Sequence, residues 1–481
     1  MHQLAQQRDR AITIYHSNDI HSRLENAGKI ATMIAHERRL IGSDRVLAVD
    51  CGDHMDRTRL ETEGSMGEVN AALLYEADYD VITLGNNEGL TFTMDDLKTA
   101  YEHHAKFAVV CANLERSSDQ QQPDWLQRNT IINKNGITIG ITAVTAYFHQ
   151  VYRLIGWHAT EPIAAVQQQV AQMREQVDLV IVLSHLGLTM DYRLAEQVDG
   201  IDIIFGAHTH HLIEEPIIHH GAAICAAGKF GDHVGRVEVV FPAGSNQPII
   251  RGECLPTAAI VEREEQTSII YNYRNHAAVK LQRVITTLER PLPALLDRES
   301  ELPNLLAIGL KNWMKADIGL VNNGQLLGGL ASGDVTAGEL HALCPSPINP
   351  CLMELTGRDV RLALEQSLQS EFIYKPIKGF GFRGERLGKL ALAGLTVHYS
   401  LEENEVAIIH KVEVNGQLLR DDQMYRVGTI DMFCFKIGYE SLASAKINQL
   451  FMPEFLRDII ETELANAVSL NQCQQKTWLL I

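Results

Sequence analysis

The sequence predicts an α/β fold for the first half of the chain, for three reasons. Short apolar, β-rich runs alternate with stretches of helix length, which is the pattern of a sheet covered by helices. Several of these runs are almost continuously apolar, as in strands that are buried on both faces. After residue 257 a charged, helix-favouring stretch interrupts the alternation. We therefore expect an α/β domain over residues 1–257 and a separate domain beyond the interruption.

The individual elements follow from these runs. The expected strands cover residues 12–15, 46–49, 81–84, 107–110, 137–144, 179–183 and 201–205. The expected helices between them cover residues 28–40 and 67–77. This order of strands and helices predicts α/β layers, in which helices cover a sheet.

The stretch 258–290 predicts a connecting helix, which continues to Glu289 and is stopped by Pro291 and Pro293. Residues 291–481 predict an α+β domain with helices at 302–315, 359–369 and 454–466. They also predict a hairpin whose first strand leads into Asn415-Gly416, a favoured two-residue turn, and whose second strand covers 425–430.

Composition limits the possible partners. The chain has 481 residues, of which 42 are basic and 60 acidic, so its net charge is −18. This charge disfavours nucleic acid as a partner. No apolar run reaches the roughly 18 residues of a membrane helix, and the first ten residues are polar, so we expect a cytoplasmic protein that does not bind membranes. The eight cysteines form no CxxC pair, which favours buried, reduced thiols.

Polar turns that carry Asp, Asn or His follow five of the expected strands. In open α/β sheets, ligands bind beyond the carboxyl ends of the strands, so these turns are expected to converge. Carboxylate and imidazole ligands suit zinc, manganese or iron, and seven candidates are too many for one tetrahedral ion. The sequence therefore predicts two divalent metal ions, with ligands drawn from the turns 18–21, 50–53, 85–88, 184–185 and 206–210.

The ordered series of these turns resembles the calcineurin-like metallophosphoesterases, and the opening 14–21 resembles their 5′-nucleotidase branch. Asn322-Asn323-Gly324 and Leu355-Thr356-Gly357 resemble patterns in the C-terminal domain of that branch. The resemblance implies a four-layer sandwich, in which two facing mixed sheets are flanked by helices, followed by an α+β substrate-binding domain.

The resemblance also implies how the ligands are shared. Asp19, His21, Asp53 and His210 would hold one ion. Asp53, Asn86, His185 and His208 would hold the other, so that Asp53 bridges. The ions would be manganese, zinc, cobalt or iron, and a hydroxide between them would attack phosphorus in line.

One departure from the family pattern concerns catalysis. Asn87 stands where the family usually has a histidine that aids the transition state, and an amide cannot transfer a proton. We therefore expect either substrates whose leaving group needs little protonation or a substitute histidine, for which His54 is the nearest candidate. Asn87 itself is expected to donate a hydrogen bond to a phosphoryl oxygen.

The second half departs as well, because Leu327 replaces an expected phosphate-binding arginine. The loop 379–384 offers two aromatic rings and a guanidinium instead. The candidate substrate-binding residues are Arg298, Asn322, Phe380, Phe382, Arg383 and Phe433. For each phenylalanine, core packing is an equally good interpretation.

The function that follows is a two-metal phosphohydrolase that acts on nucleotides or related phosphoesters and phosphoanhydrides. Two alternatives stay open. One is a 2′,3′-cyclic nucleotide 2′-phosphodiesterase, and the other is a non-catalytic nucleotide-binding protein on a decayed enzyme scaffold.

Overall fold

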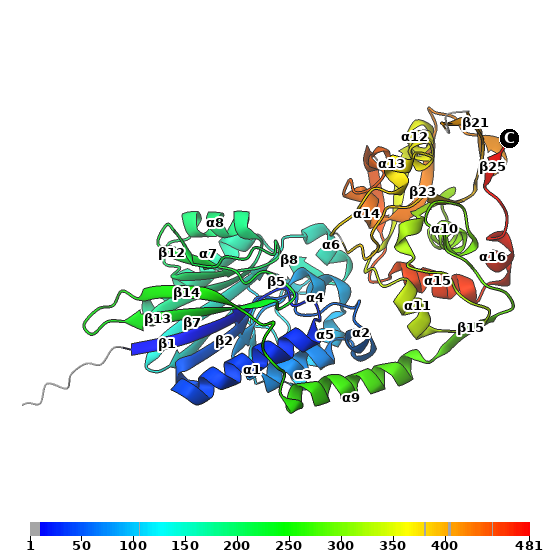
Figure 1. Ribbon diagram of the computed structural model, residues 1–481. Coiled ribbons are helices and arrows are strands. Elements are labelled where there is room, and N and C mark those ends of the chain that lie inside the picture. The colour runs from blue at the N-terminus through cyan, green and yellow to red at the C-terminus, as the bar shows by residue number, and fades with distance from the viewer. Residues whose placement is uncertain (1–9, 105, 380, 403–405, 445) are drawn as a thin grey trace, which may run out of the picture. The chain divides into compact units, whose positions relative to one another are not determined.

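The computed structural model describes residues 10–104, 106–379, 381–402, 406–444 and 446–481. The chain divides into two compact units, which are residues 1–277 and 278–481 (Figure 1). None of the helices in the described ranges is both long enough and apolar enough to cross a membrane.

The first unit contains a six-stranded sheet that begins with the N-terminal strand. Four strands run parallel, β13 pairs antiparallel with β1, and β14 pairs antiparallel with β13. Their order is β14 (Ile249–Pro256), β13 (His233–Phe241), β1 (Arg10–Ser17), β2 (Val46–Asp50), β3 (Val81–Ile82) and β4 (Ala108–Val109).

A second six-stranded sheet has four parallel strands at its centre and an antiparallel strand at each edge. Its order is β11 (Ile217–His219), β12 (Ala222–Cys225), β10 (Ile203–Gly206), β9 (Leu179–His185), β7 (Ile137–Thr145) and β6 (Asn129–Lys134). A short antiparallel pair, β5 (Leu114–Arg116) and β8 (Trp157–Ala159), lies outside both sheets.

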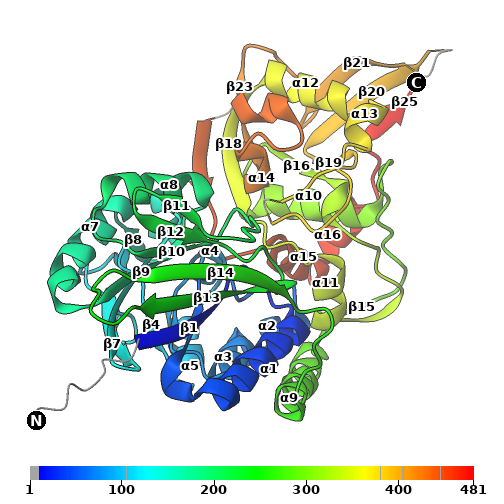
Figure 2. The ribbon, with the colours of Figure 1, turned by 60° about the vertical axis from the view of Figure 1, so that its left-hand side comes forward.

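The two sheets face each other across a core to which both contribute, including Ile14, Val49, Ile141, Leu183 and Phe205. Helices α1 (Leu24–Ile41), α3 (Glu68–Glu76) and α5 (Met94–Glu102) cover the first sheet. Helices α7 (Pro162–Met173) and α8 (Leu188–Gln197) cover the second (Figure 2). The shorter helices are α2 (Leu60–Ser65), α4 (Asn86–Thr91) and α6 (His149–Leu154). The expected four-layer α/β sandwich is confirmed.

The connecting helix is shorter than expected. Helix α9 covers Glu264–Leu281, and residues that we expected to continue it form strand β15 (Val284–Leu288) instead. This strand pairs with β17 (Gly333–Thr336) in the second unit. The cause is the run Val284-Ile285-Thr286-Thr287, because β-branched side chains favour strands over helices.

The second unit is an α+β domain, as expected. Its five-stranded sheet has the order β19 (Leu390–Ala393), β16 (Ile318–Asn322), β23 (Met424–Ile430), β18 (Pro350–Thr356) and β24 (Lys446–Leu450). Its four-stranded sheet has the order β22 (Gln417–Leu418), β21 (Ala407–Val414), β20 (Leu395–Leu401) and β25 (Trp478–Leu480). Its helices are α10 (Glu301–Trp313), α11 (Ala337–Leu343), α12 (Gly357–Ser367), α13 (Ser370–Ile373), α14 (Asp431–Cys434), α15 (Leu456–Leu464) and α16 (Ala467–Gln472).

The predicted hairpin turn is present, but its predicted return strand is wrong. Asn415 and Gly416 have φ angles of 49° and 81° and join β21 to β22, as in a two-residue turn of the primed type. The returning strand ends at Leu418, where the charged segment Arg420-Asp421-Asp422 follows. Residues 424–430 pair with β18 and β16 in the other sheet, because their mostly buried side chains suit a central strand.

Candidate metal centre

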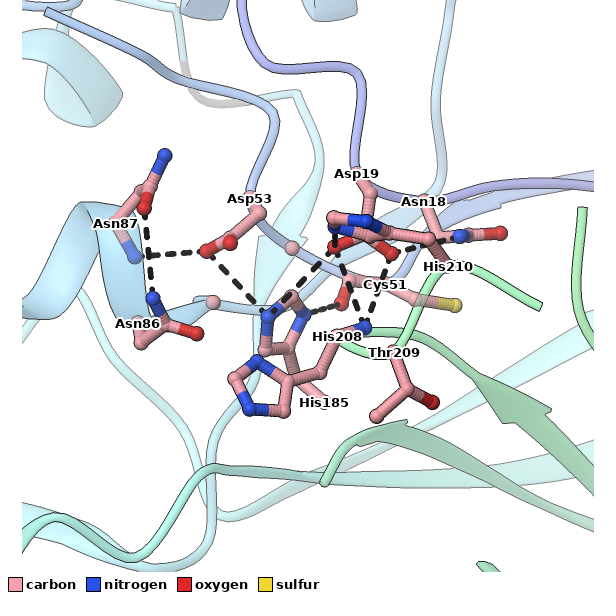
Figure 3. A network of polar contacts seen from close by, with 12 residues as sticks. Asn18, Asp19, Cys51, Asp53, Asn86, Asn87, His185, His208, Thr209 and His210 are labelled. Atoms are coloured by element: carbon pink, nitrogen blue, oxygen red, sulfur yellow. Dashed lines mark hydrogen bonds and ion pairs between the residues drawn. The ribbon is translucent and has the colours of Figure 1, made fainter. Parts of the chain in front are cut away.

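Side chains from the ends of five strands meet at one edge of the sandwich (Figure 3). Asp19 and His21 follow β1, Asp53 follows β2, and Asn86 begins the helix after β3. His185 ends β9 in the second sheet, and a turn after β10 carries the last two ligand candidates, His208 and His210. The structure thus brings together candidates that lie up to 191 positions apart in the sequence, because both sheets present the carboxyl ends of their strands at this edge.

One group of donors consists of Asp19, His21 and His210, whose ligand atoms lie within 4.8 Å of one another. Asp19 Oδ1 lies 3.4 Å from His210 Nε2 and 3.9 Å from His21 Nε2. The two Nε2 atoms are 3.3 Å apart. Two imidazole nitrogens and a carboxylate oxygen at such distances suit a divalent transition metal.

A second group consists of Asp19, Asp53 and His185. His185 Nε2 lies 3.4 Å from Asp53 Oδ1 and 4.0 Å from Asp19 Oδ1. The other oxygen of Asp53, Oδ2, lies 3.9 Å from His21 Nε2. The carboxylate of Asp53 therefore faces both groups, and Asp19 also belongs to both.

Two buried atoms at this edge have no hydrogen-bond partner in the described structure. They are His185 Nε2 and Asn86 Oδ1. Buried polar atoms are normally hydrogen-bonded, whereas His185 Nε2 has only its ion-pair contact with Asp53 at 3.4 Å. An imidazole nitrogen and an amide oxygen are both metal donors. The His208 ring lies beside them, with its centroid 5.2 Å from that of His185. The donors present therefore fit divalent cations.

Hydrogen bonding and charge set the protonation of His185. Its Nδ1 lies 2.8 Å from the Cys51 carbonyl and can donate to it, which turns Nε2 toward the two carboxylates. Burial by itself lowers the pKa of His185, but the charges of Asp53 and Asp19 outweigh burial and raise it to about 10. For His208, burial and the neighbouring His185 lower the pKa to about 4, so this ring is neutral at pH 7.

The backbone at the site is strained. Asp19, His21, Asp53, His208 and His210 have φ angles between 46° and 71°, in the left-handed region that non-glycine residues rarely adopt. Hydrogen bonds between the turns hold this conformation. Asp19 N–H donates to the Gly52 carbonyl at 3.0 Å, and His21 N–H donates to the Asp53 carbonyl at 2.8 Å. The turns after β1 and β2 therefore fix each other.

Asn18 and Glu88 support the site, and the sequence did not single out either of them. The Asn18 amide donates to Asp19 Oδ2 at 2.8 Å and accepts from Ala227 N–H at 2.9 Å, which orients the first carboxylate. Glu88 accepts three backbone N–H groups, those of Gly85, Asp53 and Met55. Burial and the charge of Asp53 raise the pKa of Glu88 to about 7. The sequence signal for Glu88 is its position three residues after Gly85, because an acidic residue at that position often caps a helix.

The two predicted catalytic side chains, Asn87 and His54, contact polar groups of the protein itself. Asn87 Nδ2 donates to the Met55 carbonyl at 3.1 Å and lies 3.0 Å from His21 Nδ1, so in this structure the amide positions a ligand candidate. His54 is 4% exposed and lies 3.1 Å from the Asn70 amide. Burial lowers the pKa of His54 to about 3, which leaves it neutral and poorly suited as an acid.

The predicted substrate-binding residues divide into buried and exposed ones. Phe382 and Phe433 are 5% and 0% exposed and belong to the core of the second unit, so core packing is the interpretation that fits them. Asn322 is also buried, and its amide donates to the Leu387 carbonyl and accepts from Gln325. The Arg298 side chain is 71% exposed, and Arg383 is half-buried. Phe380 lies outside the described residues.

Comparisons with known proteins agree with this geometry. Residues 12–212 match the family model of the calcineurin-like phosphoesterases, and residues 284–440 match that of the 5′-nucleotidase C-terminal domain. The uncharacterized metallophosphoesterase YunD of Bacillus subtilis is 34% identical over 464 residues, which cover 94% of this chain and 99% of that protein. A 5′-nucleotidase of Mus musculus is 24% identical over 92% of this chain and 82% of its own length.

Solved structures share the fold over both units. A putative 5′-nucleotidase from Staphylococcus aureus superposes with a TM-score of 0.68 and 18% identity, covering 98% of this chain and 99% of that one. The NAD nucleotidase of Haemophilus influenzae superposes with a TM-score of 0.66 and 16% identity, covering 98% of each chain.

Removing the space that Gly85 leaves for Asp53 should weaken metal binding. A Cβ on Gly85 would collide with the Asp53 carboxylate and backbone nitrogen. We expect Gly85→Ala to weaken manganese binding by about tenfold or more. Calorimetric titration with Mn²⁺ measures this, with circular dichroism to establish that the variant is folded. Gly328→Ala, where a Cβ meets nothing within 4 Å, is the matched control. Unchanged manganese affinity in folded Gly85→Ala would contradict the placement of Asp53.

Metal affinity should rise with pH. In the metal-free protein His185 carries a proton up to a pKa of about 10, and a cation must displace that proton to bind Nε2. Below that pKa the affinity for Mn²⁺ should therefore increase by up to roughly tenfold per pH unit. Chelator-competition titrations at about pH 6, 7 and 8 measure the slope, and an affinity independent of pH would be the contrary result.

Proposed function

Because the chain belongs to the calcineurin-like phosphoesterases, in the branch with a 5′-nucleotidase C-terminal domain, and is thus a phosphoester hydrolase, we propose that its substrates are nucleotides or related small molecules. Relatives along its whole length include a 5′-nucleotidase and an NAD nucleotidase by name. The single observation that carries the proposal is the pair of donor groups that share Asp19, with the Asp53 carboxylate facing both.

Two cations are proposed at this centre, each of them manganese, zinc, cobalt or iron. Asp19, His21, Asp53 and His210 hold one, and Asp53, Asn86, His185 and His208 hold the other. His185 Nε2 and Asn86 Oδ1, which are buried without a hydrogen bond, support the second set. Bound cations supply positive charge that orients a phosphate group and neutralises charge on its oxygens.

The protein's own groups prepare the centre for that role. Asn87 N–H donates to Asp53 Oδ1 at 2.7 Å, which fixes the carboxylate that faces both donor groups. The Asn87 side chain positions His21 and carries no proton to give to a leaving group. The reaction therefore favours a leaving group that departs without protonation.

The second unit supplies recognition of the nucleoside in this proposal. Of the residues singled out from the sequence and described in the structure, Arg298 and Arg383 retain exposed surface for a polar contact. The two alternatives are separated by experiment: cleavage of 2′,3′-cyclic nucleotides alone identifies a cyclic phosphodiesterase, and nucleotide binding without turnover identifies a binding protein.

A phosphate-release screen tests the proposal. The full chain is loaded with Mn²⁺, Co²⁺ or Zn²⁺ and given nucleoside monophosphates, nucleotide sugars and 2′,3′-cyclic nucleotides. For phosphodiester and pyrophosphate substrates, chromatography detects the phosphorylated product. We expect metal-dependent turnover that Asp53→Asn lowers by about a hundredfold or more, because a neutral amide cannot replace a shared carboxylate.

The matched control is Asp95→Asn, which removes an exposed carboxylate on α5. It should retain wild-type turnover. Activity that survives both metal chelation and Asp53→Asn would overturn the two-metal proposal.

A further inference from the structure

An aromatic residue outside the ligand set lies against the metal centre. The Phe230 ring packs edge-on to His21, with ring centroids 5.8 Å apart. Its backbone is fixed on both sides: Phe230 N–H donates to the Asp19 carbonyl at 2.7 Å, and its carbonyl accepts from the Asn26 amide at 2.9 Å. Phe230 has a φ of 62°, which is unusual for a bulky residue. The fold therefore holds this ring beside a ligand candidate in a strained backbone conformation.

Two cations lie over the Phe230 ring. The Arg23 guanidinium carbon is 4.9 Å from the ring centroid, and Lys229 Nζ is 4.7 Å from it. Both residues are exposed. Within the described ranges of the chain, no ion pair involves either of them, whereas nearby Arg59 pairs with Glu25 and Glu61. In a chain with a net charge of −18, two cations without a carboxylate partner lie next to the metal centre.

We propose that Arg23, Lys229 and Phe230 form a second phosphate subsite. It binds the phosphate that lies next to the one attacked, so the preferred substrates contain a phosphoanhydride bond, as in nucleoside diphosphates and nucleotide sugars. The inference rests on the proposed function, because the first phosphate must be bound at the metal centre. Arginine offers paired N–H donors to phosphate and lysine a compact charge, and the ring limits where both can move.

The chemistry of such a substrate fits the groups present. Water supplies an oxygen to the attacked phosphorus, and the bond from that phosphorus to the bridging oxygen breaks. The bonding electron pair leaves with the second phosphate, and the protons of the water pass to the product phosphates and solvent. Arg23 and Lys229 neutralise the negative charge that collects on the second phosphate. No side chain has to protonate this leaving group, which agrees with an amide at position 87.

If Arg23 and Lys229 have a purely electrostatic role, the variants show a different pattern of ligand affinities. If they only balance the acidic cluster of Asp19, Asp53 and Asp56, their loss changes metal affinity and affects all phosphate ligands alike. If they form a subsite, their loss changes the preference between ligands with one and with two phosphorus groups. The experiment therefore compares two such ligands in each variant.

The manganese-loaded full chain is titrated calorimetrically with methylene diphosphonate, which cannot be hydrolysed at its bridge, and with methylphosphonate. We expect the wild type to prefer the diphosphonate. Arg23→Gln and Lys229→Gln should each lower the ratio of the two affinities by about 3- to 10-fold, as for partly exposed charge pairs. Arg39→Gln, an exposed arginine on α1, is the control and should keep the wild-type ratio.

An unchanged ratio in both variants overturns the subsite, and so does an equal loss of affinity for both ligands accompanied by loss of manganese. Turnover separates this result from the proposed function. If the wild type hydrolyses nucleotides while the ratio stays unchanged, the subsite fails and the proposed function stands. If the ratio falls as expected but no phosphoester or phosphoanhydride is hydrolysed, the two cations bind a second phosphate group, and it is the proposed function that fails.

Discussion

The position of the Asp53 carboxylate is the constraint on which the rest of the centre depends. One of its oxygens faces His185 at 3.4 Å and the other faces His21 at 3.9 Å, so a single side chain joins donors from both sheets. Asn87 N–H holds it at 2.7 Å, and Gly85 must lack a side chain to make room for it. The two sheets have to meet at the correct edge before any of these distances can form.

This arrangement costs stability locally, and the surrounding turns compensate. Five of the seven ligand candidates adopt left-handed backbone conformations, each of which costs on the order of 1 kcal/mol or more. Reciprocal hydrogen bonds between the turns after β1 and β2, together with the three N–H groups bound by Glu88, hold these conformations. Donor atoms are thus fixed before a cation arrives, which reduces the reorganisation that binding requires.

Because the chain departs from the family pattern, other side chains have to recognise the substrate. Phe382 and Phe433 pack into the core of the second unit, and the Asn87 amide lies 3.0 Å from His21 Nδ1. Cationic and aromatic side chains are nevertheless present beside the centre, in the first unit itself. Arg23 and Lys229 lie over the Phe230 ring, which packs against His21. Cations at this place suit a substrate whose leaving group needs no proton, which agrees with the absence of a proton donor at position 87.

The sequence by itself determined the α/β and α+β classes and most strand positions, because apolar periodicity is a local signal, and polar residues at the strand ends pointed to the edge where five of the proposed ligands form donor groups. It could not determine that Asp19 is shared by both donor groups, that Glu88 supports the turn, or that residues 424–430 join a different sheet from their hairpin. Those features depend on which strands become neighbours. Burial of Phe433 and exposure of Arg23 were likewise decided only by tertiary structure, since the same residue type serves a core or a site according to what packs against it.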